Sequence, residues 1–176
     1  MSDLLYSLFA ALSLAGVAVL LLAAAFSDLS RYRIPNRICF AVAVLFVAFI
    51  PGGEVTFGEV AWRVGVALTV LIVGLVLHGR GYIGGGDVKL LAALSLWVAP
   101  LAWPLFLLEI LVFGGLLALA ILLLRKSKSR LPDSVRSRQW MGRLLSENEG
   151  IPYGVAISFG GLVYLTQEFG RLNLPV

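Results

Sequence analysis

The fold is decided by the apolar stretch LLYSLFAALSLAGVAVLLLAAAF, which occupies residues 4–26. It contains no charged residue, and a helix of about 20 apolar residues is long enough to cross the hydrocarbon core of a bilayer. The whole chain of 176 residues agrees, because 60% of it is hydrophobic, only 14% is charged and the mean hydropathy is +0.96. A soluble domain carries roughly 25% charged residues. The composition therefore excludes an ordinary soluble protein and predicts a membrane protein.

Five further apolar segments follow this first one, at about 38–50, 60–78, 88–98, 105–124 and 153–169. The second is short and needs Pro35 and Asn36 as its opening turn to approach the ~17 residues of the shortest spans. The fourth ends before Pro100 and is too short to cross comfortably, so a thinned or partly re-entrant passage stays open. We therefore expect an all-α, polytopic membrane protein with about six transmembrane helices, forming a single domain over residues 1–176.

The basic residues predict how this bundle is oriented. Of the 14 Lys and Arg residues, 12 lie in or beside the loops after the first, third and fifth segments, the last being a basic loop at about 125–150. The other two are Arg171 and Arg63, which is expected to form an interfacial pair with Trp62. Because positively charged loops stay in the cytoplasm, we expect these three loops inside and both termini outside the cytoplasm. No groove-reading motif predicts nucleic-acid binding.

Two aspartates are placed together by this topology. Asp28 lies at the cytoplasmic end of the first segment and Asp87 at the cytoplasmic start of the fourth, at the same membrane depth. Ionisable groups at such a depth are costly and point to function. A pair of carboxyl groups around one water can hydrolyse a peptide, since one accepts a proton from water and the other protonates the leaving amine. Taken singly, each is more typical of an interfacial helix cap or an ion-pair partner, as Arg31 would be for Asp28. The pair with its flanking motifs favours the catalytic interpretation instead.

The motifs around these aspartates resemble a known family. DLSRYRIPN (28–36) and GGGDVKL (84–90) are similar to the two signatures of the type IV prepilin peptidases, intramembrane aspartic proteases with a GxGD motif, and IPYGVAI (151–157) opens the last segment as in that family. The resemblance covers nearly the whole chain. It implies an aspartic endopeptidase of the bacterial inner membrane with Asp28 and Asp87 as its catalytic dyad. Such an enzyme removes the basic leader of prepilin-like precursors at the cytoplasmic face.

The chain departs from the longer members of that family in one respect. Those members carry an inserted zinc-binding segment with two CxxC pairs and also N-methylate the new terminus, whereas Cys39 is the single cysteine here. The resemblance therefore implies peptidase activity without methylation, as in the short forms of Flp (Tad) pili. It implies no metal, nucleotide or organic cofactor, because water is the nucleophile and the two carboxyl groups suffice. The expected partners are a prepilin-like substrate and the lipid bilayer, and the oligomeric state stays open.

Seven other residues lie close to the aspartates in sequence or topology and are candidates for shaping the site: Gly84, Gly86, Lys89, Pro35, Asn36, Tyr153 and Gly154. The glycines would let a substrate backbone approach without interference from a Cβ atom. Lys89 places a positive charge two residues after Asp87. Pro35 and Asn36 would fix the start of the second helix, with Asn36 as its cap. Tyr153 and Gly154 would line the substrate groove.

Two alternatives use the same sequence features differently. In a small proton-coupled transporter or channel the two aspartates would relay protons or bind a cation, with Glu109 in the fifth segment as a further link. Glu109 is otherwise expected to be neutral, paired across the bundle or beside a water-filled cleft. The second alternative is a non-catalytic subunit of a pilus or secretion assembly. His78, the only histidine, is expected to be a solvated helix cap.

Overall fold

The computed structural model describes residues 2–51, 55–128, 132, 139–146 and 149–171. Within them the chain forms helices and no strand: α1 (Ser2–Arg31), α2 (Asn36–Phe49), α3 (Phe57–Gly79), α4 (Gly85–Ser95), the short 3-10 helix η1 (Pro100–Ala102), α5 (Trp103–Lys126), α7 (Gln139–Leu144) and α8 (Tyr153–Arg171). Among these residues, α1, α3 and α5 are long and apolar enough to cross a membrane, and α2 is a shorter apolar helix. The prediction of an all-α, polytopic membrane protein is confirmed.

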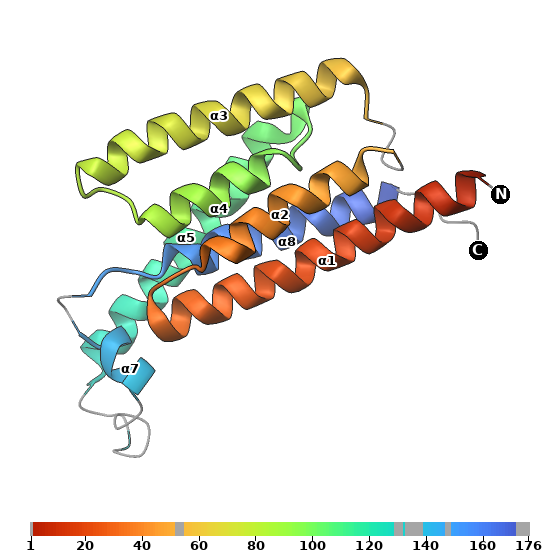
Figure 1. Ribbon diagram of the computed structural model, residues 1–176. Coiled ribbons are helices and arrows are strands. Elements are labelled where there is room, and N and C mark those ends of the chain that lie inside the picture. The colour runs from red at the N-terminus through yellow and green to blue at the C-terminus, as the bar shows by residue number, and fades with distance from the viewer. Residues whose placement is uncertain (1, 52–54, 129–131, 133–138, 147–148, 172–176) are drawn as a thin grey trace.

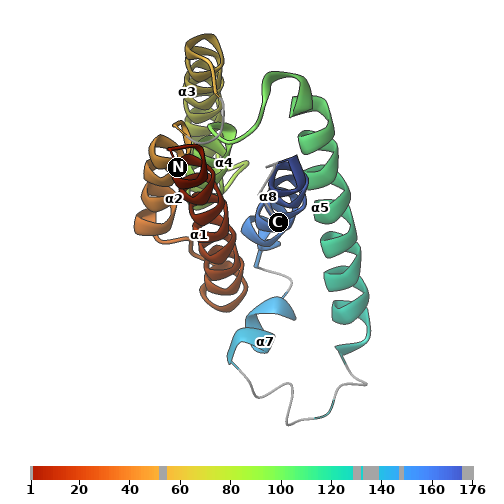
Figure 2. The ribbon, with the colours of Figure 1, turned by 90° about the vertical axis from the view of Figure 1, so that its right-hand side faces the viewer.

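The helices form a bundle in which α4 and α8 lie between two outer helices, α3 and α5 (Figures 1 and 2). The core is made of side chains with almost no accessible surface, such as Leu21 of α1, Leu90 and Leu94 of α4, and Phe106 of α5. The beginning of α1 and the end of α8 lie at one end of the bundle, and α7 lies at the other (Figure 1). We call the end with α7 the aspartate end, because Asp28 and Asp87 lie toward it.

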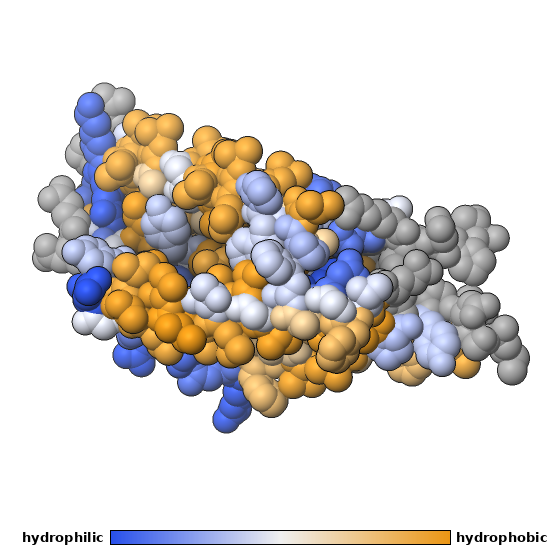
Figure 3. All heavy atoms as spheres, turned by 90° about the horizontal axis from the view of Figure 1, so that it is seen from above, coloured by the Kyte–Doolittle hydropathy of each residue, from blue (hydrophilic) through white to orange (hydrophobic). Residues whose placement is uncertain are grey.

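The outer face of α3 is apolar, as expected for a helix in contact with lipid. Its exposed large side chains include Leu68, Ile72 and Val76, and apolar groups cover most of the molecular face on that side (Figure 3). The inner face approaches α4 closely at Gly74, where a Cβ atom would lie 2.4 Å from Cγ1 of Val88. The close approach of the two helices therefore depends on the missing side chain.

Helix α4 is too short to cross a bilayer by itself. Its 11 residues span about 16 Å at about 1.5 Å per residue, against about 30 Å of hydrocarbon. The chain beyond it is buried among other helices: the Trp97 indole donates to the Val42 carbonyl (3.0 Å), and the Ala99 N–H donates to the Tyr164 hydroxyl (2.9 Å). Non-helical backbone at membrane depth is tolerated where protein groups satisfy it in this way.

Arg63 takes part in this arrangement, a role that the prediction of an interfacial pair with Trp62 did not include. Its side chain is 5% exposed, lies over the Phe46 ring and donates from Nη1 to the carbonyls of Leu96 (3.3 Å) and Trp97 (2.8 Å). The early end of α4 leaves these carbonyls without helical partners, and Arg63 supplies the missing donors.

In its described residues, the predicted basic loop contains a helix that the sequence did not indicate. Helix α7 begins at Gln139, and Leu144 and Leu145 at its end are buried. The basic residues Arg130, Arg136 and Arg138 of the predicted loop lie outside the described residues.

Candidate active site

Asp28 lies within the last turn of α1, because the helix continues past it to Arg31. The Tyr32 N–H still donates to the Asp28 carbonyl (2.8 Å), and the helix then ends where Tyr32 takes a φ of 54°. The Asp28 side chain is 6% exposed. Its Oδ2 is buried and has no hydrogen-bond partner among the described residues, so the carboxyl group is held in the protein with an acceptor to spare.

The N-terminus of α8 faces this carboxyl group. The backbone N–H groups of Gly154 and Val155 lie against Asp28, and the first N–H groups of a helix lack helical acceptors and attract anions. The approach requires glycine, because a Cβ atom at position 154 would lie 2.7 Å from Asp28 Oδ2 and 2.5 Å from Ile34 Cδ1.

Asp87 lies near the N-terminus of α4, which Gly84 precedes. A Cβ atom at Gly84 would lie 2.7 Å from Asp87 Oδ2, so the carboxyl group folds back over the glycine. The Gly154 N–H lies against Asp87 as it does against Asp28, and the two carboxyl groups interact electrostatically. One backbone amide of α8 therefore lies beside both carboxyl groups.

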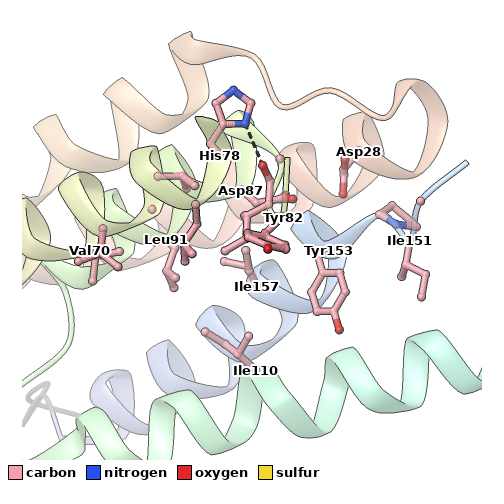
Figure 4. Close-up of a pocket in the computed structure, with 18 of the residues that line it drawn as sticks. Asp28, Val70, His78, Tyr82, Asp87, Leu91, Ile110, Ile151, Tyr153 and Ile157 are labelled. Carbon is pink, nitrogen blue, oxygen red and sulfur yellow. Dashed lines mark hydrogen bonds between the residues drawn. The ribbon is translucent and has the colours of Figure 1, made fainter. Parts of the chain in front are cut away.

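Two hollows meet at this pair of carboxyl groups. The larger is a cavity of about 1080 Å³, lined by both aspartates and by mostly apolar side chains of α3, α4, α5 and α8, among them Val70, Leu91 and Ile110 (Figure 4). The smaller, of about 280 Å³, is lined by both aspartates and by polar groups such as Asn36 together with the backbone of residues 84–86. The pair lies where an apolar and a polar space adjoin, an arrangement that can present a peptide and water to the same groups. The described part of the chain contains no group of three or more His, Cys, Asp or Glu side chains that could hold a metal ion.

A model of the Type IV leader peptidase family matches residues 6–119. The chain belongs to the type IV leader peptidase family. Neither the search of curated proteins nor the search of solved structures finds a match. The matched span of the leader peptidase includes both aspartates and ends within α5, so α8 and Gly154 lie beyond it.

Among the predicted site-shaping residues of the peptidase, Lys89 and Asn36 are brought together. The Lys89 ammonium donates to Asn36 Oδ1 (3.0 Å), which ties α4 to the start of α2. The prediction that Asn36 caps α2 is wrong: the residue preceding the helix is Pro35, and no side chain caps it. Asn36 is already the first helical residue, and its side chain bonds to Lys89 instead of to the backbone of its own helix.

The glycines and Tyr153 shape the site through close contacts. A Cβ atom at Gly86 would lie 3.2 Å from Ile34 Cβ, and one at Gly154 would lie 2.5 Å from Ile34 Cδ1. The Ile34 side chain therefore packs against both glycines. The Tyr153 ring lines the large cavity and packs against α5, where a Cβ atom at Gly114 would lie 2.9 Å from it. The glycine-rich run has one left-handed residue, Gly81 with a φ of 80°. The glycines nearest the aspartates are therefore required for close packing and not for a left-handed backbone conformation.

Glu109 and His78 lie in different surroundings. Glu109 accepts a hydrogen bond from the Gln167 amide (3.0 Å) and lines neither hollow, so it is paired across the bundle. The His78 ring forms a hydrogen bond with the Ile83 carbonyl (2.8 Å) and packs against Gly85. It is therefore more than a solvated cap, because it ties the end of α3 to the segment that leads into α4.

Two residues near the aspartates were not singled out from the sequence. Tyr32 lines both hollows, and burial raises the pKa of its phenol above the ordinary value. Ile34 is buried against the glycines described above. Both lie in the motif at residues 28–36, and their closeness to Asp28 in the sequence could have indicated that they belong to the site.

Proposed function

We propose that this leader peptidase is an intramembrane aspartic endopeptidase in which Asp28 and Asp87 form the catalytic dyad. The observation that carries the proposal is that both carboxyl groups lie against the Gly154 N–H, at the border of an apolar and a polar hollow. Two carboxyl groups held this close share one proton, since both cannot readily be ionised. The pair then contains one proton acceptor and one proton donor.

The proposed reaction is hydrolysis of a peptide bond by water. The ionised carboxylate takes a proton from water while the water oxygen attacks the carbonyl carbon. The protonated carboxyl group then gives its proton to the nitrogen as the C–N bond breaks, so the products are a free acid and a free amine. After the cycle the pair again holds one proton. The Gly154 N–H supports this chemistry as a fixed donor that stabilises whichever carboxyl group carries the charge.

The proposed substrate is a prepilin-like membrane precursor, cleaved after its short basic leader. The apolar lining of the large cavity supports this, because Val73 of α3 and Ile157 of α8 suit a hydrophobic segment that ends beside the aspartates. The distribution of basic residues supports an aspartate end that faces the cytoplasm, with both termini on the opposite side of a bacterial inner membrane. The whole chain would then act as one membrane-embedded unit.

N-methylation forms no part of the proposed activity, and the proposal needs no cofactor. Only residues 32–35 separate α1 from α2, so this turn is too short for an inserted zinc-binding segment. The lone Cys39 is buried in α2. These features support a short peptidase of the kind that serves Flp (Tad) pili.

The test is to express the full chain together with a prepilin and to follow removal of the leader by its shift in mass. Asp28→Asn and Asp87→Asn are each expected to abolish processing. Glu109→Gln is the matched control, since it neutralises an acid of α5 that lines neither hollow, and it is expected to process normally. Normal processing by both aspartate variants would refute the proposal. Loss of ion flux in them without any effect on processing would favour the transporter.

A further inference from the structure

Arg125 joins three segments of the chain at the aspartate end. It lies in the last turn of α5 and is half-buried. Its Nε donates to the Leu144 carbonyl (2.9 Å) at the end of α7. Its Nη2 donates to the carbonyls of Glu149 (2.8 Å) and Gly150 (3.3 Å). One guanidinium group therefore holds both ends of the segment between α7 and α8.

The same guanidinium group lies near enough to the phenol of Tyr32 to interact with it electrostatically, although the Tyr32 hydroxyl has no hydrogen-bond partner among the described residues. Tyr32 follows Asp28 by four residues, ends α1 with its left-handed backbone and lines both hollows. A phenol is neutral at neutral pH, and burial raises the pKa of Tyr32 further, so it is a dipolar neighbour of Arg125 and carries no charge. Arg125 thus connects the turn after Asp28 with the segment before α8.

The segment held by Arg125 leads directly to the amide that lies beside both aspartates. Only Ile151 and Pro152 separate Gly150 from the first residue of α8, and Pro152 is fully buried. A proline has a fixed φ, so this link is short and stiff. A displacement at Gly150 is therefore passed on to the Gly154 N–H.

We propose that Arg125 is a positioning residue that holds the N-terminus of α8 against Asp28 and Asp87. The expected effect of Arg125 on catalysis rests on the proposed function, whereas its expected effect on the position of α8 does not. The orientation of the bundle explains a positive charge at the end of α5. It does not explain three hydrogen bonds to backbone carbonyls, which use the planar, many-donor geometry of arginine that lysine lacks.

Lys126 provides a matched control. It is the next residue, has the same formal charge and the same weight in the charge balance of the loop, and its side chain is exposed. A comparison of R125A with K126A separates the hydrogen bonds of Arg125 from the charge that orients the chain. R125K keeps the charge and removes the planar fork.

The structural half of the experiment is hydrogen–deuterium exchange on the purified full chain in lipid nanodiscs. In R125A, amides of residues 149–155 are expected to exchange about 10-fold faster or more than in the wild type, since opening of this segment becomes easier. R125K should be intermediate and K126A unchanged, and amides of α4 should be unchanged in all three. Equal exchange over residues 149–155 in R125A and K126A would overturn the proposal. Should R125A fail to fold, R125K against K126A decides in the same way.

The kinetic half measures prepilin cleavage by the same variants. R125A is expected to lose about 10- to 100-fold in kcat with KM nearly unchanged, because misplacement of a catalytic group costs rate more than binding. K126A is expected to cleave at the wild-type rate. Millimolar guanidinium ion should restore part of the lost rate in R125A and leave the rate of K126A unchanged. A kcat for R125A equal to that of the wild type would refute the catalytic role. If the wild type itself cleaves no prepilin, the proposed function fails, while the exchange data still decide whether Arg125 positions α8.

Discussion

Substitution of Gly154 by alanine tests the contact on which the candidate site is built. The new Cβ atom would lie 2.7 Å from Asp28 Oδ2 and 2.5 Å from Ile34 Cδ1. Ordinary contacts begin at 3.4 Å, so the carboxyl group or the N-terminus of α8 must move by about 0.7 Å. The isoleucine can turn away at its flexible end, but the carboxyl group is buried and the amide is part of a helix.

A displacement of this size is expected to reduce catalysis far more than folding. A misplacement of about 1 Å can cost about 100-fold in rate, so Gly154→Ala should lower kcat by about 10- to 100-fold with little change in KM. Overpacking of a core typically costs about 1–3 kcal/mol, which leaves the chain folded. The assay is cleavage of a purified prepilin in nanodiscs, with thermal unfolding measured in parallel.

Gly115→Ala is the matched control for this substitution. Gly115 lies within α5, and a Cβ atom there would meet nothing within 4 Å. The control should cleave at the wild-type rate. If Gly154→Ala also cleaves at that rate, the close approach of α8 to Asp28 has no part in catalysis and the reasoning is refuted.

Three further predictions follow from the structure. Gly86→Ala should lower kcat less than Gly154→Ala, about 10-fold or below, because its Cβ atom would lie 3.2 Å from Ile34 Cβ, a milder contact than the 2.7 Å between a Cβ atom at Gly154 and Asp28 Oδ2; an equal or larger loss in the same cleavage assay would contradict this. Arg63→Met should lower the free energy of unfolding by about 1.5–3 kcal/mol, the range for hydrogen bonds to charged groups, since the carbonyls of Leu96 and Trp97 lose their donor; an unchanged denaturation midpoint would show that the bonds are dispensable. The cleavage rate should follow a bell-shaped pH profile, falling at low pH where both carboxyl groups are protonated and at high pH where both are ionised; a rate that rises steadily with pH would point to a single base.

Much of the fold follows from local patterns in the sequence. Runs of apolar residues predict helices because the bilayer requires a hydrogen-bonded backbone and an apolar surface. Each predicted segment corresponds to a helix in the structure, although α4 ends at Ser95, before the end of the segment predicted at 88–98. The same pattern indicated that Asp28 and Asp87 lie toward one end of the bundle. The motifs around these aspartates indicated the family, and the match over residues 6–119 confirms it.

The contacts that complete the site depend on packing between distant segments, which no local pattern contains. Arg63 reads as an interfacial residue until the early end of α4 is known, and Arg125 reads as a topology signal until α7 and the start of α8 surround it. Gly154 was expected to line a groove, but its amide lies beside both carboxyl groups because the N-terminus of α8 lies against the end of α1 and the start of α4. Asn36 was expected to cap its own helix, and it lies within reach of Lys89 only because α2 and α4 are neighbours.

The central claim is that Asp28 and Asp87 act as one catalytic unit. It is tested most directly by single-turnover rates of prepilin cleavage in Asp28→Asn, Asp87→Asn and the double variant. Residues that act as a unit are strongly non-additive. Each single substitution should therefore reduce the rate by about 1000-fold or more, and the double variant should be no slower than the slower single one. A single variant that cleaves at the wild-type rate, or losses that multiply in the double variant, would contradict the claim.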